Sequence, residues 1–421
     1  MKKFTVLISF VFILVYSLSS CETELYDKEI VEQILDYSFH NDTVDAYHTW
    51  RLMSEHNIHV ENTVSNSDRV LLLTEDPHEN ETAEILSEQP IRDGGSASML
   101  YSVALAQHQL YAAVVTVDGA YHVTPFKKGD SRVTVLTDSK ATKRTYKPSQ
   151  QEVYYCFCTD YPQPSSSWDF NDLVLRISRK DVDDYTVQLN VTLVAVGTML
   201  QEAAALRLAG VDYDEIESLT RVNNKSFAVN SSFGRTIIKD GEDLLHSLNG
   251  EAVINLFDDA HIALNSDGID ASAQVIRGYY NVGNSTDPSY LYANEVTVSY
   301  LVKFKQKGRA KAVTYDIIDP FVAYNYNGSI WEVHKYLYKH DEVLFQYYSG
   351  NPFNYDTGYT WALEIPYSWF RYPLQGYTIG SYKEGVIRGC YRERGHSFGE
   401  WAANRNQAID WYLYPMQGSV Y

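Results

Sequence analysis

Hydrophobic and polar positions alternate along four stretches in the first third of the chain, and such alternation is typical of half-buried β-strands. The stretches are RVLLLTED at 69–76, MLYSVALAQ at 99–107, LYAAVVTVDGAYHV at 110–123 and RVTVLTD at 132–138. Asp118-Gly119 interrupts the third stretch, and this dipeptide favours a tight hairpin turn. We therefore expect a small N-terminal β-sandwich over residues 41–146.

A second series of strand-like stretches begins after the polar segment YKPSQQ at 146–151, which we interpret as a linker. It comprises EVYYCFC at 152–158, DYTVQLNVTLVAVG at 184–197 and VTVSYLVKFKQ at 296–306. Helical periodicity is rare, and its candidates are ELYDKEIVEQILDYSF at 24–39, EDLLHSL at 242–248 and HSFGEWAANRN at 396–406. The pattern predicts a mostly β protein with few short helices, in which a larger β-rich domain over 152–421 follows the sandwich.

The N-terminus has the order of a secretory signal peptide. Two lysines, an apolar run over 4–16 and the residues LSSC at 18–21 follow one another. This ending resembles the lipobox of bacterial lipoproteins, so we expect removal of residues 1–20, a lipid on Cys21 and a lipidated tether with a short helix over 21–40. An uncleaved membrane helix is the alternative, but the apolar run is shorter than the ~20 residues that a span needs.

Acidic residues outnumber basic ones, 54 to 35, and the formal net charge is −19. Such a chain is not expected to bind nucleic acid non-specifically, because that requires basic side chains that neutralise phosphates. Its charge suits cation binding or solubility. The acidic residues that follow Cys21 resemble the surface-export signals of some Gram-negative lipoproteins. We therefore expect an outer-membrane lipoprotein that is exposed at the cell surface and contacts the membrane through its lipid.

Three cysteines remain after Cys21, namely Cys156, Cys158 and Cys390. The first two lie two positions apart in an expected strand, on one face, where a bond between them is unfavourable. Pairing of one of them with Cys390 is an alternative in an oxidising compartment. A zinc site made of the three thiols is less favoured, because no second closely spaced pair of ligands appears.

The segment DFND at 169–172 carries the strongest candidate chemistry, because oxygen-bearing side chains stand directly before an apolar strand pattern. Asp169, Asn171 and Asp172, with Asp160 across a short loop, offer the hard oxygen atoms that calcium prefers. An EF-hand is excluded, since its fifth position would be Leu173. The alternative is that these side chains cap a turn by bonding to the local backbone.

The segment CTDYPQPSSSWDFNDLVLRI at 158–177 resembles the opening of the LruC domain of bacterial lipoproteins, in which an acidic strand end, a short loop and a DxDFND motif lead into a strand. Asp160, Asp169, Asn171 and Asp172 match that motif. Thr159 and Trp168 depart from it, which leaves fewer carboxylates. Further similar stretches are LVAVGTMLQEAAALRLAGV at 193–211, VINLFDDAH at 253–261, IDPFV at 318–322, WEVH at 331–334, IPYSWFRYPLQGYTI at 365–379 and DWYLYP at 410–415.

The resemblance extends over roughly Glu152 to Pro415. It implies a lipid-anchored protein of the cell envelope, with calcium held by the matched DFND residues. Two upstream stretches, LYD at 25–27 and VDAYHTW at 44–50, are similar to the start of these lipoproteins. His48 in the second stretch is better explained as packed beside Trp50 than as a metal ligand.

Other residues have two interpretations each. Asp258 and Asp259 either complete a cation site or cap a turn. Glu332 and His334 are on one side of an expected strand, and we interpret them as a surface pair rather than as acid–base groups. Tyrosine is abundant, with 35 residues, and suits exposed sheet faces as well as carbohydrate-facing or protein-facing surfaces. In the C-terminal part, Tyr359, Trp361 and Trp369 are candidates for stacking on sugar rings.

Four common motifs of catalysis and nucleotide binding are absent: the chain lacks Gly-x-Ser-x-Gly, a phosphate-binding glycine loop, His-Glu-x-x-His and a dinucleotide fingerprint. We therefore expect a non-enzymatic surface protein with a structural or adhesive role, stabilised by calcium and contacting a surface protein or glycan. A glycan-binding accessory lipoprotein is the alternative. A glycosidase with unrecognised paired carboxylates is the third hypothesis.

Overall fold

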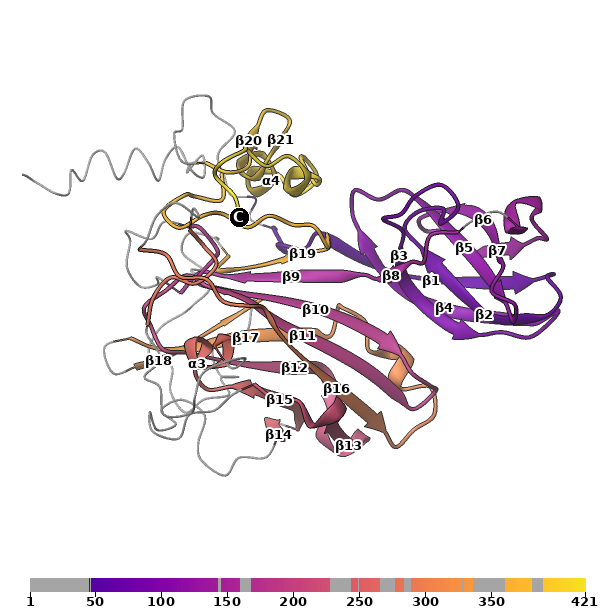
Figure 1. Ribbon diagram of the computed structural model, residues 1–421, viewed down its shortest axis with the longest axis horizontal. Helices are drawn as coiled ribbons and strands as arrows, with labels where there is room; N and C mark the ends of the chain where they lie inside the picture. The colour runs from indigo at the N-terminus through magenta and orange to yellow at the C-terminus, as the bar shows by residue number, and fades with distance from the viewer. Residues whose placement is uncertain are drawn as a thin grey trace, which may run out of the picture.

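The computed structural model describes residues 45, 47–142, 145–159, 168–227, 244–248, 250–265, 277–283, 289–326, 329–335, 360–380 and 389–421. The expected signal peptide, Cys21, the tether over 21–40 and Asp160 lie outside these ranges. Strands dominate the described residues, and the two α-helices among them are short (Figure 1). The prediction of a mostly β fold is confirmed.

The N-terminal body is a β-sandwich, drawn in indigo to purple in Figure 1. One sheet has the order β4-β1-β7 and the other β6-β5-β2-β3-β8. Apolar side chains of both sheets, among them Ile58, Met99 and Val114, form one buried cluster between them. Its elements are β1 Met53–Asn62, β2 Ser67–Leu73, β3 Glu84–Pro90, β4 Ser96–Ala104, β5 Gln109–Thr116, β6 Tyr121–Lys127, β7 Arg132–Val135, the 3-10 helix η1 Ser139–Thr142 and β8 Ser149–Gln150.

The hairpin predicted at Asp118-Gly119 joins β5 to β6. Gly119 has φ +85°, a left-handed conformation that glycine adopts without steric cost. The Thr116 hydroxyl donates to Asp118 Oδ1 at 2.5 Å and closes the turn. The local sequence therefore determines this connection.

Two larger sheets form the second body, with the orders β13-β16-β11-β10-β9-β19 and β14-β15-β12-β17-β18. Their facing apolar side chains build the main core of the described residues, for example Leu175, Val191 and Leu206. The elements up to β18 are β9 Glu152–Phe157, β10 Leu173–Asp181, β11 Thr186–Val196, β12 Glu202–Asp212, η2 Tyr213–Glu215, β13 Ile216–Arg221, η3 Val222–Asn224, β14 Leu245–Leu248, β15 Glu251–Phe257, α3 Ala260–Leu264, β16 Val296–Phe304, η5 Ala310–Ala312, β17 Ile318–Tyr326 and β18 Ser329–His334.

The helix predicted around Leu245 is wrong, because residues 245–248 form β14 and pair with β15 in antiparallel register. Leu245 lies opposite Ile254, and Leu248 lies opposite Glu251. A short apolar run does not distinguish helix from strand by its periodicity. Here the available edge of the sheet decides in favour of the strand.

The C-terminal segment packs an aromatic cluster, formed by Phe398, Trp401 and Trp411, against the larger body. It contains β19 Ala362–Ile365, β20 Arg392–Glu393, β21 His396–Ser397, α4 Phe398–Ala403 and η6 Trp411–Leu413. The helix predicted around Trp401 is confirmed as α4, and a capping box between Ser397 and Glu400 begins it.

The residues before β1 belong to this cluster. His48 stacks on Trp50 with ring centroids 4.1 Å apart, and its Nε2–H donates to the Trp401 carbonyl at 2.9 Å. Burial lowers the pKa of His48 to about 4, which keeps the imidazole neutral. His48 is thus packed beside Trp50, as expected from the sequence, and the chain contacts its own C-terminal segment before it enters the N-terminal sandwich.

The segment at 146–151 runs along the sheet of the N-terminal body. β8 pairs with β3, and Gln151 is buried while its N–H donates to the Ile85 carbonyl at 3.2 Å. Side chains also join the two bodies, since Thr314 donates to Glu55 and Ser368 donates to Glu84. The division into domains over 41–146 and 152–421 stays a prediction.

Cys156, Cys158 and Cys390 are buried free thiols. The alternative in which Cys156 or Cys158 forms a disulfide with Cys390 is therefore not observed. Burial raises the pKa of the Cys390 thiol to about 12, which keeps it protonated and unreactive. Within the ranges described above, no helix combines the length and the apolar character that a membrane span requires.

Candidate functional site

The DFND turn lies at the mouth of β10, and its polar side chains are buried. Asp169 and Asn171 are 0% exposed and Asp172 is 2% exposed. Trp168 and Phe170 both have φ +51°, a left-handed conformation that costs ~1–2 kcal/mol per non-glycine residue. Their rings anchor this strained turn, because Trp168 stacks on Trp361 at 4.4 Å and Phe170 is fully buried.

Carboxylates converge where the turn meets the end of β9. Ligand atoms of Cys158, Asp169 and Asp172 all lie within 4.8 Å of one another. Asp172 Oδ2 accepts a hydrogen bond from the Thr159 N–H at 2.6 Å and lies 3.2 Å from the Thr159 hydroxyl oxygen. Asp169 Oδ2 accepts from the Gly376 N–H at 3.4 Å. The structure thus brings together two of the predicted ligands.

Glu202 also faces this place, and the sequence interpretation missed it. It is the first residue of β12 in the opposite sheet, it is fully buried, and its Oε1 is 2.7 Å from the Thr159 hydroxyl. Thr159 therefore lies between carboxylates of the two sheets. The sequence contained one indication, because Glu202 stands directly before the apolar run AAAL at 203–206, just as Asp172 stands directly before the apolar start of β10.

Asn171 binds the surrounding backbone through one end of its amide. Its Nδ2 donates to the Pro373 carbonyl at 2.9 Å, while Oδ1 has no hydrogen-bond partner among the residues that the structure describes. Gly197 passes so close that a Cβ there would lie 2.2 Å from Asn171 Oδ1. A glycine is therefore required at the end of β11, and Asn171 Oδ1 is a buried acceptor available to a ligand.

These residues fit a hard cation in part. The carboxylates of Asp169, Asp172 and Glu202 and the amide oxygen of Asn171 are donors that calcium accepts. The Cys158 sulfur is a soft donor that suits zinc rather than calcium. Since a protonated thiol is a neutral group, Cys158 is better placed as a hydrogen-bond donor to a carboxylate than as a calcium ligand.

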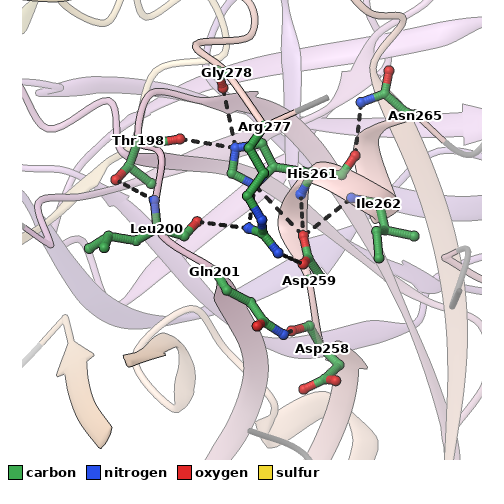
Figure 2. A network of polar contacts seen from close by, with 10 residues as sticks. All are labelled: Thr198, Leu200, Gln201, Asp258, Asp259, His261, Ile262, Asn265, Arg277 and Gly278. Carbon is green, nitrogen blue, oxygen red and sulfur yellow. Dashed lines mark hydrogen bonds and ion pairs between the residues drawn. The ribbon is translucent and has the colours of Figure 1, made fainter. Parts of the chain in front are cut away.

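Asp259 is the N-cap of α3 (Figure 2). Its Oδ1 accepts from the His261 N–H at 3.0 Å and the Ile262 N–H at 3.4 Å, and Oδ2 pairs with Arg277. Burial acts to raise its pKa, but the contacts with His261 and Arg277 hold that pKa below its usual value. Of the two interpretations of Asp259, the contacts favour a capping residue over a cation ligand. The side chain of Asp258 points away from this network.

The predicted sugar-stacking aromatics have different environments. Trp361 is 3% exposed and stacks on Trp168, so the prediction that its ring meets a sugar is wrong: the ring already has a partner in the core. Trp369 is 47% exposed and offers a free surface. Tyr359 lies outside the residues that the structure describes.

Glu332 and His334 are not a surface pair, because each is 2% exposed. His334 Nδ1 lies 2.9 Å from Asp319 Oδ2, and His334 Nε2 lies 3.3 Å from Glu332 Oε2. Arg207 Nε donates to the same Asp319 oxygen at 3.0 Å. Alternation correctly predicted that the pair shares one face, but strand periodicity does not reveal what covers that face of the sheet.

Comparison with known proteins gives one family match. The model of a domain of unknown function, DUF4842, matches residues 185–412, which is more than half of the chain. The match begins directly before β11, so it does not include the DFND turn, and it extends beyond α4 into η6. No curated protein matches the chain.

Proposed function

We propose that this chain, which belongs to the DUF4842 family, is a non-enzymatic lipoprotein of the bacterial cell envelope with a structural or adhesive role at the cell surface. Its larger body is stabilised by a calcium ion at the DFND turn. One observation supports the cation proposal above all: Asp169 and Asp172 are both buried, and their carboxylate oxygens lie within 4.8 Å of each other. The resemblance of 158–177 to the opening of LruC domains supports the same assignment.

Electrostatics explain what the cation contributes. Buried carboxylates this close repel one another, and removal from water disfavours their charged forms. A divalent cation would be held by Asp169 and Asp172, with Asn171 Oδ1 and Glu202 as further oxygen donors. It would offset the repulsion and join the β10 and β12 ends of the two sheets.

Calcium is expected to raise the thermal unfolding midpoint of the wild-type protein, and EDTA is expected to lower it again. A ligand that binds only the folded state adds about 2.7 kcal/mol at a hundredfold excess over Kd. With few carboxylates, we expect a Kd of roughly 10⁻⁴–10⁻³ M. Asp172→Asn should remove most of the calcium shift, because it deletes a charge from the cluster.

Asp184→Asn is the matched control, since Asp184 is a partly exposed acid remote from the turn, paired with Lys307 and Lys311. This variant should keep the full calcium shift. A parallel titration with zinc tests the Cys158 sulfur as a ligand. If calcium leaves the wild-type midpoint unchanged, the DFND residues act as a turn and strand cap only.

Cys21→Ala is expected to release the protein from the membrane fraction or to leave an unprocessed precursor, because the lipid is attached to that sulfur. Membrane fractionation and intact-mass measurement check this. Ser20→Ala is the control, since it keeps a small residue before Cys21 and should leave processing intact. A Cys21→Ala protein that is processed and retained like the wild type would exclude the lipid anchor.

A second candidate function is glycan binding by an accessory lipoprotein. It is favoured by Trp369, a residue that is 47% exposed and whose ring lies edge-on to Tyr367 with centroids 5.7 Å apart. Exposed aromatic rings in a polar setting are a common way to hold sugar rings. Binding to a glycan array distinguishes this function from a purely structural role.

A further inference from the structure

A cleft of about 430 Å³ lies where the N-terminal sandwich meets the C-terminal segment. This volume is within the range of small-molecule sites. One side comes from the β2–β3 region and the end of β4, and the other comes from residues 366–369 and 412–413. Its lining residues include Glu75, Glu84, Tyr367, Trp369, Tyr412 and Leu413.

The C-terminal wall of the cleft is aromatic. Tyr367 contacts both neighbours, with ring centroids 5.7 Å from Trp369 and 6.0 Å from Tyr412. Trp369 and Leu413 are 47% and 42% exposed. The ring of Trp369 is thus held by Tyr367 and still offers apolar surface to a ligand, an arrangement that limits the entropy lost on binding.

The opposite wall carries hydroxyl, amide and carboxyl groups. Glu84 is 4% exposed and accepts a hydrogen bond from Ser368. Burial raises its pKa to about 7, and burial also raises the pKa of Glu75. A carboxyl group that is partly protonated near neutral pH both donates and accepts hydrogen bonds, as sugar hydroxyls require.

Among the described residues that line the cleft, Glu75 and Glu84 are the acidic ones and none is lysine, arginine or histidine. Lys128 lies beside the lining residue Ala104, and its ammonium group donates to the carbonyls of Ala104 and Leu105. The wall is therefore acidic. It would repel carboxylate or sulfate groups of a ligand rather than bind them.

We propose that this cleft binds saccharides that lack acidic groups, with one ring stacked on Trp369 and its hydroxyls bonded to the wall that contains Glu75 and Glu84. This inference rests on the second candidate function, glycan binding, and it specifies the class of saccharide that would bind. An aromatic face opposite hydroxyl-bonding groups matches the two surfaces of a sugar ring, one apolar and one polar.

The test uses the full chain and titrates three probes by calorimetry: neutral gluco-, xylo- and manno-oligosaccharides, glucosamine oligomers, and oligogalacturonate. Neutral oligomers and glucosamine oligomers, which lack acidic groups, should bind, and oligogalacturonate should not. Trp369→Ala should weaken binding at least about tenfold, since aromatic anchors commonly contribute more than ~1.4 kcal/mol. Tyr185→Ala, which removes a 39% exposed aromatic outside the cleft, is the matched control and should bind normally.

Glu75→Lys provides a second readout, because a cation in the wall should admit oligogalacturonate. If no probe binds the wild type, both glycan binding and this inference fail. If saccharides bind but Trp369→Ala leaves their affinity unchanged, or if oligogalacturonate binds the wild type equally well, glycan binding stands and the cleft assignment is overturned.

Discussion

Replacing Asp319 by alanine is expected to lower the free energy of unfolding by about 3–5 kcal/mol, the usual cost of removing one partner from a buried ion pair. Asp319 is 0% exposed, and its Oδ2 receives contacts from Arg207 at 3.0 Å and His334 at 2.9 Å. Without this carboxylate, buried Arg207 and His334 would lose one of the two carboxylates that each contacts, and Glu251 and Glu332 would remain. Urea unfolding at neutral pH measures the loss.

Asp184→Ala is the matched control, because Asp184 also contacts two cations, Lys307 and Lys311, but does so at the surface. Surface pairs contribute about 0–1 kcal/mol. Equal losses for the two variants would show that the network around Asp319 is no more important than a solvated ion pair.

A pH series gives the same prediction a second readout. Burial alone would lower the pKa of His334, but the carboxylates of Asp319 and Glu332 raise it above its ordinary value. The stability contributed by His334 is therefore fully present below its unfolded pKa of about 6.5 and is lost as the pH rises through the higher folded value. Wild-type stability should fall over that window, and His334→Gln should lack this fall. Parallel curves would contradict the prediction.

The carboxylate of Asp319 acts at the other end of the pH range. Burial works to raise its pKa, yet His334, Arg207 and Lys335 lower it to about 2. Its contribution is present above the unfolded pKa of about 3.9 and is lost as the pH falls toward 2. The network is therefore most stabilising in mildly acidic solution.

Local patterns in the sequence were sufficient for much of the fold. Strand alternation, the Asp118-Gly119 hairpin and the helix at Trp401 all follow from interactions within a few residues. The DFND turn was found for the same reason, since Asp169, Asn171 and Asp172 are adjacent in the chain. The position of Glu202 at the start of an apolar run did not show that it joins the DFND turn, because Glu202 approaches that turn only when β10 and β12 pack together.

The alternation of hydrophobic and polar residues along a strand also did not show that the polar face of the sheet is buried. Glu332 and His334 had the pattern of a solvated pair, whereas Arg207 and Asp319 join them from two other strands. Trp361 and Trp369 could not be distinguished from the sequence. Tertiary packing buries Trp361 in the core and leaves Trp369 exposed. Pairs brought together by the register of distant strands therefore need a structure to be found.

Trp401→Ala is the second substitution with a large expected effect, a loss of about 3–5 kcal/mol in the free energy of unfolding. Trp401 is 0% exposed and lies at the centre of the aromatic cluster. Its ring is 4.5 Å from His48, 5.4 Å from Trp50 and 5.8 Å from Phe398. The deletion would leave a cavity between α4 and the residues that precede β1.

The location of the cavity adds a specific consequence. Asp45 and His48 contact the C-terminal segment through Arg405 and Trp401, so their attachment should loosen before the sheets unfold. Hydrogen exchange should therefore accelerate in residues 47–53 of Trp401→Ala, while β10 and β11 stay protected. Trp369→Ala removes the same side chain from a 47% exposed position and should cost little stability. If both variants lose the same stability and residues 47–53 exchange as in the wild type, the aromatic cluster does not hold the residues before β1 to the C-terminal segment.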